Sequence, residues 1–331
     1  MPAKLYYLGK PSDGYGWGVA NTNLVAALRQ RVEVELADYR ERYDAPVFAP
    51  IGSHDLAPAP RPFSAPLKMG YCFTEWPLPQ DAKVNAKFWD VIFCGSRWNA
   101  RRLREAGIMH CEVLHQGIDF TRFTPQPPRE SKAFTVFSGG KYEFRKGQDY
   151  VIAAMRHFMR HRPDVVLITA WHNPWPDSTR SMERSWLIRD HAKIFDDCDM
   201  KRIVQLPPTT NEQMVKAYSA AHVGLFPNRC EAGTNLVMME MMACARPVIA
   251  TCATGQADAL DGDGPMKLTN YSLDPAGWAN VNVSDILYWL ERAYINRAEL
   301  AQRGAQCRAL VERFTWAACA EQICAAAFPA G

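Results

Sequence analysis

The stretch NRCEAGTNLVMMEMMACARP, residues 228–247, decides how this chain is interpreted. It begins as a loop, residues 228–235, and continues as an apolar, methionine-rich helix that carries one carboxylate, Glu240. The first N–H groups of a helix have no partner within it, so residues 233–235 can offer donors to an anion. Glu240 follows one to two turns later, and a carboxylate there suits the two vicinal hydroxyls of a ribose. The alternative is a solvated Glu240 on a surface helix, while the methionines are interpreted as core residues.

Short apolar strands alternate with amphipathic helices along most of the chain, which predicts an α/β fold with parallel sheets. In the first half, strands are predicted over residues 4–8, 32–37, 67–73, 91–94 and 111–115. Helices are predicted over residues 19–29 and 98–106, the second with Ser96 as its N-cap. Residues 41–66 are rich in proline and alanine and are interpreted as a long irregular connection.

A proline-rich segment, residues 124–132, precedes a second α/β series and is interpreted as an interdomain linker. Strands are predicted there over residues 133–138, 165–170, 202–206, 223–226 and 247–250. Helices are predicted over residues 148–161, 181–195, 212–221, 284–293 and 297–312, in the segment around Glu240, and from Thr315 to Phe328. The predicted organisation is an N-terminal domain over residues 1–125, a linker over 126–132, a C-terminal domain over 133–312 and a final segment over 313–331. Two doubly wound domains would bind ligands at the carboxyl ends of their strands.

The composition indicates a globular protein of the cytoplasm. With 331 residues, 48% of them hydrophobic, the chain can fill two cores. A formal charge of +3 is too small to indicate a nucleic-acid or membrane surface by itself. Ten cysteines without any Cys-x-x-Cys pair predict reduced thiols and neither a disulfide framework nor a zinc site. We expect no signal peptide, because the chain begins directly with a strand, and no apolar run approaches the ~20 residues of a membrane span.

A glycine-rich loop, PSDGYGWG at residues 11–18, lies between the first strand and the first helix. Its glycines would let backbone N–H groups approach a ligand, and Asp38 follows about twenty residues later, as in dinucleotide folds. The spacing is Gly-x-Gly-x-Gly and lacks the final glycine position of the dinucleotide motif. A ligand-binding turn and a plain flexible turn both stay open. The candidate residues of this loop are Gly14, Tyr15, Gly16, Trp17 and Gly18.

A basic loop opens the second domain, in FSGGKYEFRKG at residues 137–147. Three cations, Lys141, Arg145 and Lys146, follow the double glycine. Cations beside a glycine turn suit a diphosphate, since a hydrogen bond to a charged group contributes ~1.5–3 kcal/mol net. The alternative is an exposed basic loop, but its position after the first strand of the domain favours binding.

Residues 231–247 resemble the glutamate–loop–glutamate motif of retaining, nucleotide-sugar-dependent glycosyltransferases with the GT-B fold, family four. The segment EMMACARPV, residues 240–248, matches the second half of that motif. The segment HQGID at residues 115–119, with Phe123 and Pro125, resembles the family's stretch before the linker. The segments SGGK (138–141) and KG (146–147) resemble its diphosphate-binding elements, and FTW (314–316) its closing motif. The resemblance covers most of residues 91–325.

The resemblance implies two doubly wound Rossmann-like domains that face each other across a cleft, with the last helix crossing back to the first domain. It implies sugar transfer with retention of configuration, without a metal and without a cofactor beyond the donor. The implied catalytic residues are Lys146, Lys141 and Glu231. The implied donor-binding residues are Gly139, Gly140, Arg145, Gly233, Thr234, Asn235, Leu236 and Glu240.

Three departures accompany the resemblance. Glu231 stands nine positions before Glu240, where the family has eight, and Lys141 stands where arginine is commoner. The first domain has no match for the family's catalytic-pocket histidine. The segment GYCFTEWP, residues 70–77, is either a replacement wall that offers Thr74 and Glu75 or an ordinary loop. The acceptor is expected near this segment and the glycine loop.

Two further motifs are interpreted as structural. The segment Asp261-Gly262-Asp263 resembles a metal motif but lies in a glycine-rich loop, so a turn is predicted and no metal. The segment WHNPWP, residues 171–176, is interpreted as packing tryptophans in a proline-shaped loop.

The predicted function is transfer of a sugar from a nucleoside-diphosphate sugar to a glycan, lipid-linked or small-molecule acceptor. A nucleic-acid base or modified nucleoside is an alternative acceptor, served by a local basic patch (Arg97, Arg101, Arg102 and Arg104). An NAD-dependent oxidoreductase and a non-catalytic sugar-nucleotide-binding protein stay open as other classes. The expected partners are the nucleotide-sugar donor and an unidentified acceptor, with peripheral membrane contact open.

Overall fold

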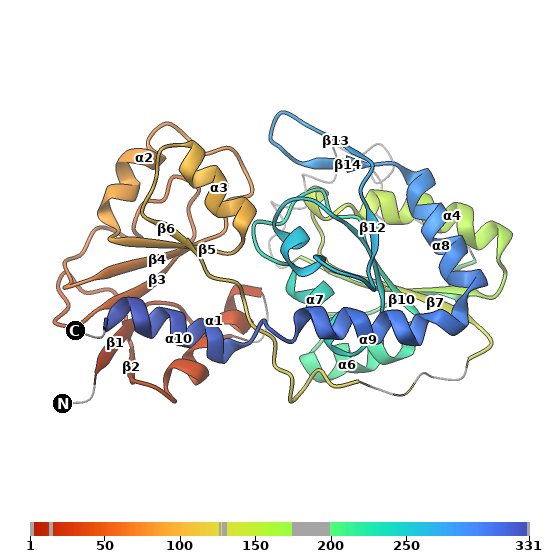
Figure 1. The fold of residues 1–331 in the computed structure, drawn as a ribbon, viewed down its shortest axis with the longest axis horizontal. Helices are drawn as coiled ribbons and strands as arrows, with labels where there is room; N and C mark the ends of the chain where they lie inside the picture. Colours follow the sequence, from red (N-terminus) through yellow and green to blue (C-terminus); the bar gives the residue numbers. More distant parts are fainter. Residues whose placement is uncertain (1–2, 13–15, 126, 128–130, 174–198, 330–331) are drawn as a thin grey trace. The chain divides into compact units, whose positions relative to one another are not determined.

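The computed structural model describes residues 3–12, 16–125, 127, 131–173 and 199–329 (Figure 1). Contacts divide the chain into two compact units. Unit 1 comprises residues 1–119, 232–234 and 314–331, and unit 2 comprises residues 120–231 and 235–313. The predicted linker over residues 126–132 stays a prediction. The predicted helix over residues 181–195 and the end of the tryptophan–proline loop lie outside the described residues.

Unit 1 is built on a parallel six-stranded sheet in the order β2-β1-β3-β4-β5-β6. Its strands are β1 (Lys4–Tyr7), β2 (Glu33–Leu36), β3 (Val47–Ile51), β4 (Lys68–Cys72), β5 (Val91–Cys94) and β6 (Cys111–Val113). Its helices are α1 (Gly16–Leu28), α2 (Ala82–Asn85), α3 (Arg97–Glu105) and α10 (Trp316–Ala327), with a short 3-10 turn, η1 (Ala86–Phe88). The predicted N-cap of α3 is confirmed, because Ser96 Oγ accepts from the Asn99 N–H at 3.1 Å.

The prediction of an irregular connection over residues 41–66 is wrong, because this segment contains β3. Val47 and Phe48 pair with β1, and all five residues of β3 pair with β4, so β3 lies inside the sheet. Proline is depleted in central strands, and the prolines around and within VFAPI therefore hid an apolar run whose side chains are almost all buried.

Helix α10 belongs to unit 1, although it lies at the end of the chain. Cys319 Sγ donates to the His115 carbonyl at 2.7 Å, and Gln322 donates to the Val113 carbonyl at 2.8 Å. A Cβ on Gly117 would lie 2.2 Å from the Trp316 nitrogen, so a glycine lets the two segments approach. The two segments that carry the family resemblance here, residues 115–119 and 314–316, are therefore neighbours.

Unit 2 contains a second parallel six-stranded sheet, in the order β12-β11-β10-β7-β8-β9. Its strands are β7 (Phe134–Lys141), β8 (Val165–His172), β9 (Ile203–Gln205), β10 (Val223–Phe226), β11 (Val248–Thr251) and β12 (Met266–Leu268). A separate hairpin pairs β13 (Tyr271–Leu273) with β14 (Ala279–Val281). The described α-helices are α4 (Gln148–His161), α6 (Asn211–Ala220), α7 (Leu236–Ala243), α8 (Val283–Ile295) and α9 (Leu300–Val311). The described 3-10 turns are η2 (Phe144–Lys146), η5 (Met200–Arg202), η6 (Gly255–Ala259) and η7 (Arg297–Glu299). The three short strands β12, β13 and β14 are absent from the sequence prediction.

Helix α7 packs against β7, β10 and β11 of the unit 2 sheet and against α9. Its N-cap is Asn235, which adopts a left-handed backbone (φ 65°) and whose side chain accepts from the Met238 N–H at 3.4 Å. The four methionines that flank Glu240 are fully buried, which confirms their interpretation as core residues. Since the helix is apolar on all sides, it is buried by the sheet and by α9 and does not present a solvated face.

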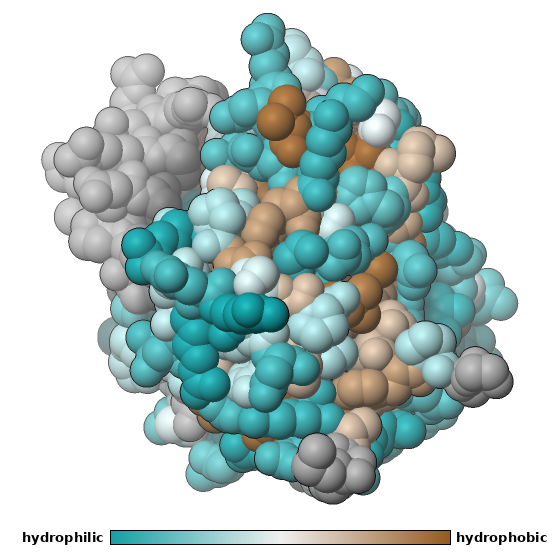
Figure 2. Space-filling view, turned by 90° about the vertical axis from the view of Figure 1, so that its left-hand side faces the viewer, coloured by the Kyte–Doolittle hydropathy of each residue, from teal (hydrophilic) through white to brown (hydrophobic). Residues whose placement is uncertain are grey.

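The exposed surface of unit 1 mixes apolar and polar side chains. Figure 2 shows hydrophobic side chains in small groups between hydrophilic ones on the face turned to the viewer. The most exposed large apolar residues of this unit include Val84 and Met109. In the part of the chain that the structure describes, every helix is too short or too polar to cross a bilayer.

Candidate active site

The basic loop that follows β7 packs against the loop that follows β10. Gly147 has a left-handed backbone (φ 69°), and a Cβ there would lie 2.2 Å from the Pro227 carbonyl oxygen. The Arg145 carbonyl accepts from the N–H groups of Arg229 at 2.8 Å and Cys230 at 3.2 Å. The two loops can approach this closely only because position 147 is a glycine. Their approach brings the cations of the loop after β7 to Glu231 in the loop after β10.

Glu231 is the centre of the resulting cluster. Its carboxylate accepts from Lys146 Nζ at 2.6 Å and from Arg145 at 3.0 Å, and Asn228 also donates to it. Burial acts to raise the pKa of Glu231, which is 5% exposed, but the charges of Lys146 and Arg145 outweigh it and lower the pKa. The structure thus brings three predicted residues together and keeps Glu231 ionised.

A second carboxylate, Glu143, joins the same cluster and is absent from the sequence prediction. It pairs with Lys141, and its Oε2 lies 2.8 Å from Arg145 Nε. Burial acts to raise the pKa of Glu143, but the charges of Arg145 and Lys141 lower it. Three cations therefore share two carboxylates, which leaves one net positive charge. A sequence signal was present, because Glu143 stands between the predicted cations, but the sequence analysis considered only the cations of this loop.

The loop after β11 holds Glu231 by its backbone. The Glu231 N–H donates to Thr254 Oγ1 at 3.1 Å, and the Gly255 N–H donates to the Glu231 carbonyl at 2.7 Å. Asn235, the N-cap of α7, donates to Gln256 at 3.2 Å. The segment 254–256 thus fixes the residues on both sides of Ala232–Thr234. Thr254 makes this contact with a positive φ of 52°, a backbone conformation that costs of order 1–3 kcal/mol in a residue other than glycine.

Arg229 links the two site loops to helix α4. It donates to both carboxylate oxygens of Asp149, at 2.7 and 2.6 Å, and to the Phe144 carbonyl at 2.8 Å. Its guanidinium lies between the rings of Phe144, at 3.9 Å, and Tyr150, at 4.0 Å. A buried arginine in such a cage orders the backbone that carries Arg145 and Lys146. No sequence pattern links this pair, since its partners lie 80 positions apart.

Glu240 is buried and has a partner that the sequence did not reveal. Its Oε2 accepts from the hydroxyl of Tyr218, on α6, at 2.8 Å. Burial raises the pKa of Glu240 to about 7, while the Tyr218 hydrogen bond and the charge of Arg122 act against that rise. The interpretation of Glu240 as a solvated surface residue is wrong, because only 8% of it is exposed.

Three of the remaining predicted donor residues, Gly139, Gly140 and Leu236, lie at the end of β7 and the start of α7. A Cβ on Gly139 would lie 2.9 Å from Val237, so a glycine lets the first turn of α7 approach the end of β7. Gly140 has a positive φ (127°) beside the Lys146 side chain. Leu236 is the first residue of α7. Gly233 and Thr234 cluster with unit 1, and the buried Thr234 Oγ1 has no hydrogen-bond partner among the described residues.

The predicted acceptor residues lie in unit 1. Gly14 and Tyr15 fall outside the described residues, whereas Gly16, Trp17 and Gly18 form the first turn of α1. The Trp17 ring packs edge-on against Phe73 at 4.8 Å. Thr74 is buried and accepts from Asn99, and Glu75 is half-buried. The acceptor role of these residues stays a prediction.

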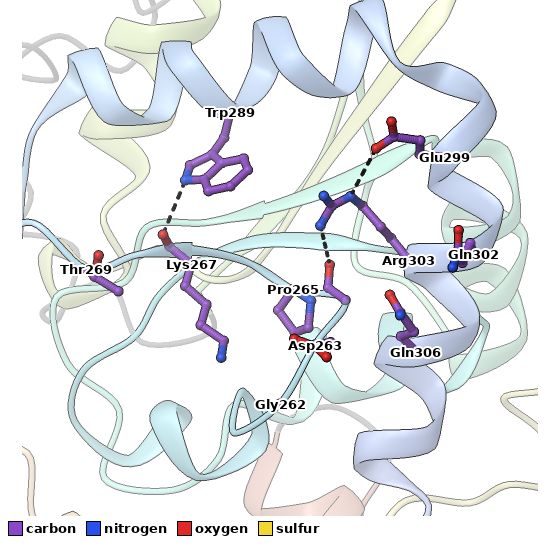
Figure 3. A pocket seen from close by; sticks show the side chains of 11 residues that line it. Gly262, Asp263, Pro265, Lys267, Thr269, Trp289, Glu299, Gln302, Arg303 and Gln306 are labelled. Atoms are coloured by element: carbon purple, nitrogen blue, oxygen red, sulfur yellow. Dashed lines mark hydrogen bonds and ion pairs between the residues drawn. The ribbon is translucent and has the colours of Figure 1, made fainter.

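A separate groove lies in unit 2 between the loop 262–265 and helices α8 and α9 (Figure 3). It encloses about 550 Å³ and is lined by Asp263, Lys267, Trp289 and Arg303, among others. The Trp289 indole donates to the Lys267 carbonyl at 3.2 Å. Gly262 and Asp263 of this groove belong to the segment that the sequence analysis interpreted as a turn. Among the described residues, no group of three or more acidic, histidine or cysteine side chains could hold a metal ion.

Comparisons with known proteins show which sequences and structures this chain resembles. Residues 132–281 match the family model described as glycosyl transferases group 1. The chain is 26% identical to a D-inositol 3-phosphate glycosyltransferase of Xylanimonas cellulosilytica, over 69% of this chain and 54% of that protein. It is 25% identical to a GDP-mannose-dependent monoacylated alpha-(1-6)-phosphatidylinositol monomannoside mannosyltransferase of Corynebacterium glutamicum, over 71% of this chain and 61% of that protein. The chain thus spans little more than half the length of these relatives.

Solved structures match nearly the whole chain. A sucrose-phosphate synthase of Thermosynechococcus elongatus aligns with a TM-score of 0.68 at 15% identity, covering 97% of each chain. The Anabaena protein HepE, solved with UDP and glucose, aligns with a TM-score of 0.69 at 14% identity, covering 98% of this chain and 99% of that one.

Two parallel six-stranded sheets with flanking helices, matched in this way, define a GT-B fold, which confirms the predicted fold class. The match over residues 132–281 places this part of the chain among the group 1 glycosyltransferases, as the resemblance implied.

Proposed function

We propose that this protein is a retaining, metal-independent glycosyltransferase that uses a nucleoside-diphosphate sugar as donor. One observation carries the proposal: Lys146 and Arg145 meet at Glu231, and their cluster has one net positive charge. Lys146 lies beside Gly140 at the end of β7, and the neighbouring Gly139 approaches Val237 in the first turn of α7. Cations and unpaired helix N–H groups at one place suit a diphosphate. The buried Thr234 hydroxyl without a described partner, two residues before α7, supports a ligand there.

The proposed chemistry uses charge that develops as the donor breaks. The bond between the anomeric carbon and the diphosphate oxygen breaks, and its electron pair stays on the diphosphate. The acceptor hydroxyl forms the new bond on the same face of the sugar, and its proton passes to an oxygen of the departing diphosphate. Lys146 and Arg145, assisted by Lys141, neutralise the departing diphosphate, so they act mainly in the transition state. Glu231 contacts the hydroxyls of the donor sugar.

The role we propose for Glu240 is to hold the ribose. Tyr218 donates to Oε2. We assign the other carboxylate oxygen, Oε1, as the acceptor of a ribose hydroxyl. A protonated carboxyl group could also donate to a ribose oxygen, because the pKa of Glu240 is about 7. Ribose hydroxyls do not change charge in the reaction, so Glu240 should affect donor binding more than turnover.

The acceptor belongs to one of several classes. The two relatives named above carry inositol or phosphatidylinositol acceptors in their names, which supports a hydroxylated, lipid-linked or small-molecule acceptor. Peripheral membrane contact would serve the lipid-linked case. A nucleic-acid acceptor has less support: of the predicted patch, Arg102 stacks on Trp98 and Arg104 donates to the Cys111 carbonyl. The cytoplasm is the proposed compartment, because the nine described cysteines are all free thiols.

The experiment measures donor binding and transfer with a panel of UDP and GDP sugars. UDP or GDP at a hundred times its dissociation constant should stabilise the protein by ~2.7 kcal/mol, and NAD should give no comparable shift. Slow hydrolysis of the preferred donor should persist in EDTA. Lys146→Ala should lower kcat by ~10²–10³ while the Kd of the diphosphate changes less.

Glu240→Gln serves as the matched variant at the same site, since it should raise KM and largely spare kcat. A melting shift with NAD and none with any nucleoside diphosphate would support the oxidoreductase and refute the transferase. Tight diphosphate binding with no turnover of any donor would leave a non-catalytic sugar-nucleotide-binding protein.

A further inference from the structure

Thr254 adopts a backbone conformation that threonine rarely takes. Its φ is 52° and its ψ is −151°, at the edge of a region that glycine alone occupies readily. A β-branched side chain makes this conformation a genuine outlier, because the Cβ substituents crowd the backbone. Such an outlier persists only where the surrounding contacts hold it.

The contacts of Thr254 lead to Glu231. Its Oγ1 accepts from the Glu231 N–H, and the next residue, Gly255, donates to the Glu231 carbonyl. Thr254 is 8% exposed and Glu231 is 5% exposed, so both bonds are shielded from water. The peptide groups on both sides of Glu231 are therefore fixed by one turn after β11. The orientation of the carboxylate toward Lys146 and Arg145 depends on that fixed backbone.

We propose that Thr254 is a positioning residue for Glu231, and that its hydroxyl is the reason the strained threonine stands where a glycine would fit without strain. The inference rests on the proposed function and assigns a residue that acts through Glu231 without touching the substrate. Glycine would satisfy the backbone but would leave the Glu231 N–H buried and unpaired, which is unfavourable. Threonine provides the acceptor at the cost of the backbone strain.

The test compares Thr254→Val with Thr254→Ser. Valine keeps the shape and the strain but removes the hydroxyl, and serine keeps the hydroxyl. Thr254→Val should lower kcat roughly 10–100-fold, as expected for a misplaced catalytic group, with KM within about two-fold of the wild type. Thr254→Ser should recover most of the lost kcat.

Thr315→Val is the matched control. It removes a bond of the same kind, from the Ala318 N–H to Thr315 Oγ1 at 3.0 Å, at the start of α10 in unit 1. It should lower the melting temperature about as much as Thr254→Val does and leave kcat unchanged.

A double-mutant cycle with Glu231→Gln identifies the route of the effect. If Thr254 acts through Glu231, Thr254→Val should change kcat far less in the Glu231→Gln background than in the wild type. Wild-type kcat in Thr254→Val, or an effect that adds in full to that of Glu231→Gln, would overturn the inference. Wild-type protein without any transfer would instead refute the proposed function, so the two failures are distinguishable.

Discussion

At the scale of single residues, the neighbours of two buried glutamates shift their pKa values in opposite directions. Glu231 and Glu240 are both buried, yet the pKa of Glu231 is lowered while burial raises that of Glu240 to about 7. Two cations stabilise the charge on Glu231, whereas Glu240 has a neutral tyrosine hydroxyl as its described hydrogen-bond donor. The same residue type thus supplies a fixed negative charge at one position and a titratable group at the other.

Glu240 should make stability depend on pH. Its folded pKa lies above the ordinary value of 4.5, so its contribution is fully present below that value and is lost as pH rises toward 7. Glu240→Gln removes the titration, and its stability relative to the wild type should rise by up to about 3 kcal/mol between pH 4 and pH 8. Urea unfolding of both proteins at the two pH values measures this difference.

Tyr218→Phe provides the comparison for that prediction. It removes the hydroxyl that holds the pKa of Glu240 down, so the loss of stability should extend to higher pH than in the wild type. A gap between Glu240→Gln and the wild type that stays constant from pH 4 to pH 8 would show that Glu240 is ionised throughout.

At the scale of elements, a buried ion pair joins η2 and α4 to the loop after β10. Arg229 and Asp149 are 3% and 4% exposed, and Arg229 is also stacked between two rings. Its carbonyl accepts from the Ala279 N–H of β14 at 2.9 Å, which brings the hairpin into the same contact. Arg229 therefore links the basic loop after β7, which carries Arg145 and Lys146, to the hairpin.

Breaking this pair from one side should be costly. Arg229→Met leaves the Asp149 carboxylate buried without its partner and should lower the free energy of unfolding by ~3–5 kcal/mol. The double variant Arg229→Met/Asp149→Leu should recover much of that loss, because no uncompensated charge is left. Urea unfolding of the two variants and the wild type measures the difference. Equal losses in the single and double variants would show that the ring stacking, and not the ion pair, stabilises the loop.

At the scale of the whole molecule, the chain builds each unit from segments that are distant in sequence. Unit 1 takes its last helix from residues 314–331 and a three-residue loop from residues 232–234. The cluster of cations and carboxylates around Glu231, in contrast, lies within unit 2. Its residues and their supports come from the end of β7, η2, the loop 228–231 and the turn 254–256.

Nucleotide binding should therefore protect unit 2 first. Hydrogen exchange in the presence of saturating UDP or GDP should slow most in residues 139–147 and 228–231, because these carry the cations and their counter-carboxylates. The measurement is exchange followed by peptide mass analysis, with NAD as the comparison ligand. Protection confined to the first turn of α1 would favour the dinucleotide interpretation of the glycine loop.

The sequence by itself determined the alternation of strands and helices, and with it the fold. Periodicity is a local property, so α4 was predicted with both ends correct and β10 likewise. It also located the cations, Glu231 and the start of α7, because glycines, charges and caps lie within a few residues of one another. The sequence did not reveal how the strands pair. The strand β3 was missed because its prolines indicate a loop, whereas in the structure it pairs with two neighbouring strands.

Only the tertiary structure decided which polar groups contact one another. Tyr218 with Glu240, Asp149 with Arg229 and Thr254 with Glu231 are 22, 80 and 23 positions apart. No spacing rule links such residues, because parallel strands return to the same edge of a sheet only after a whole helix has intervened. The environment that sets a pKa or fixes a peptide group therefore forms only when the sheet is complete.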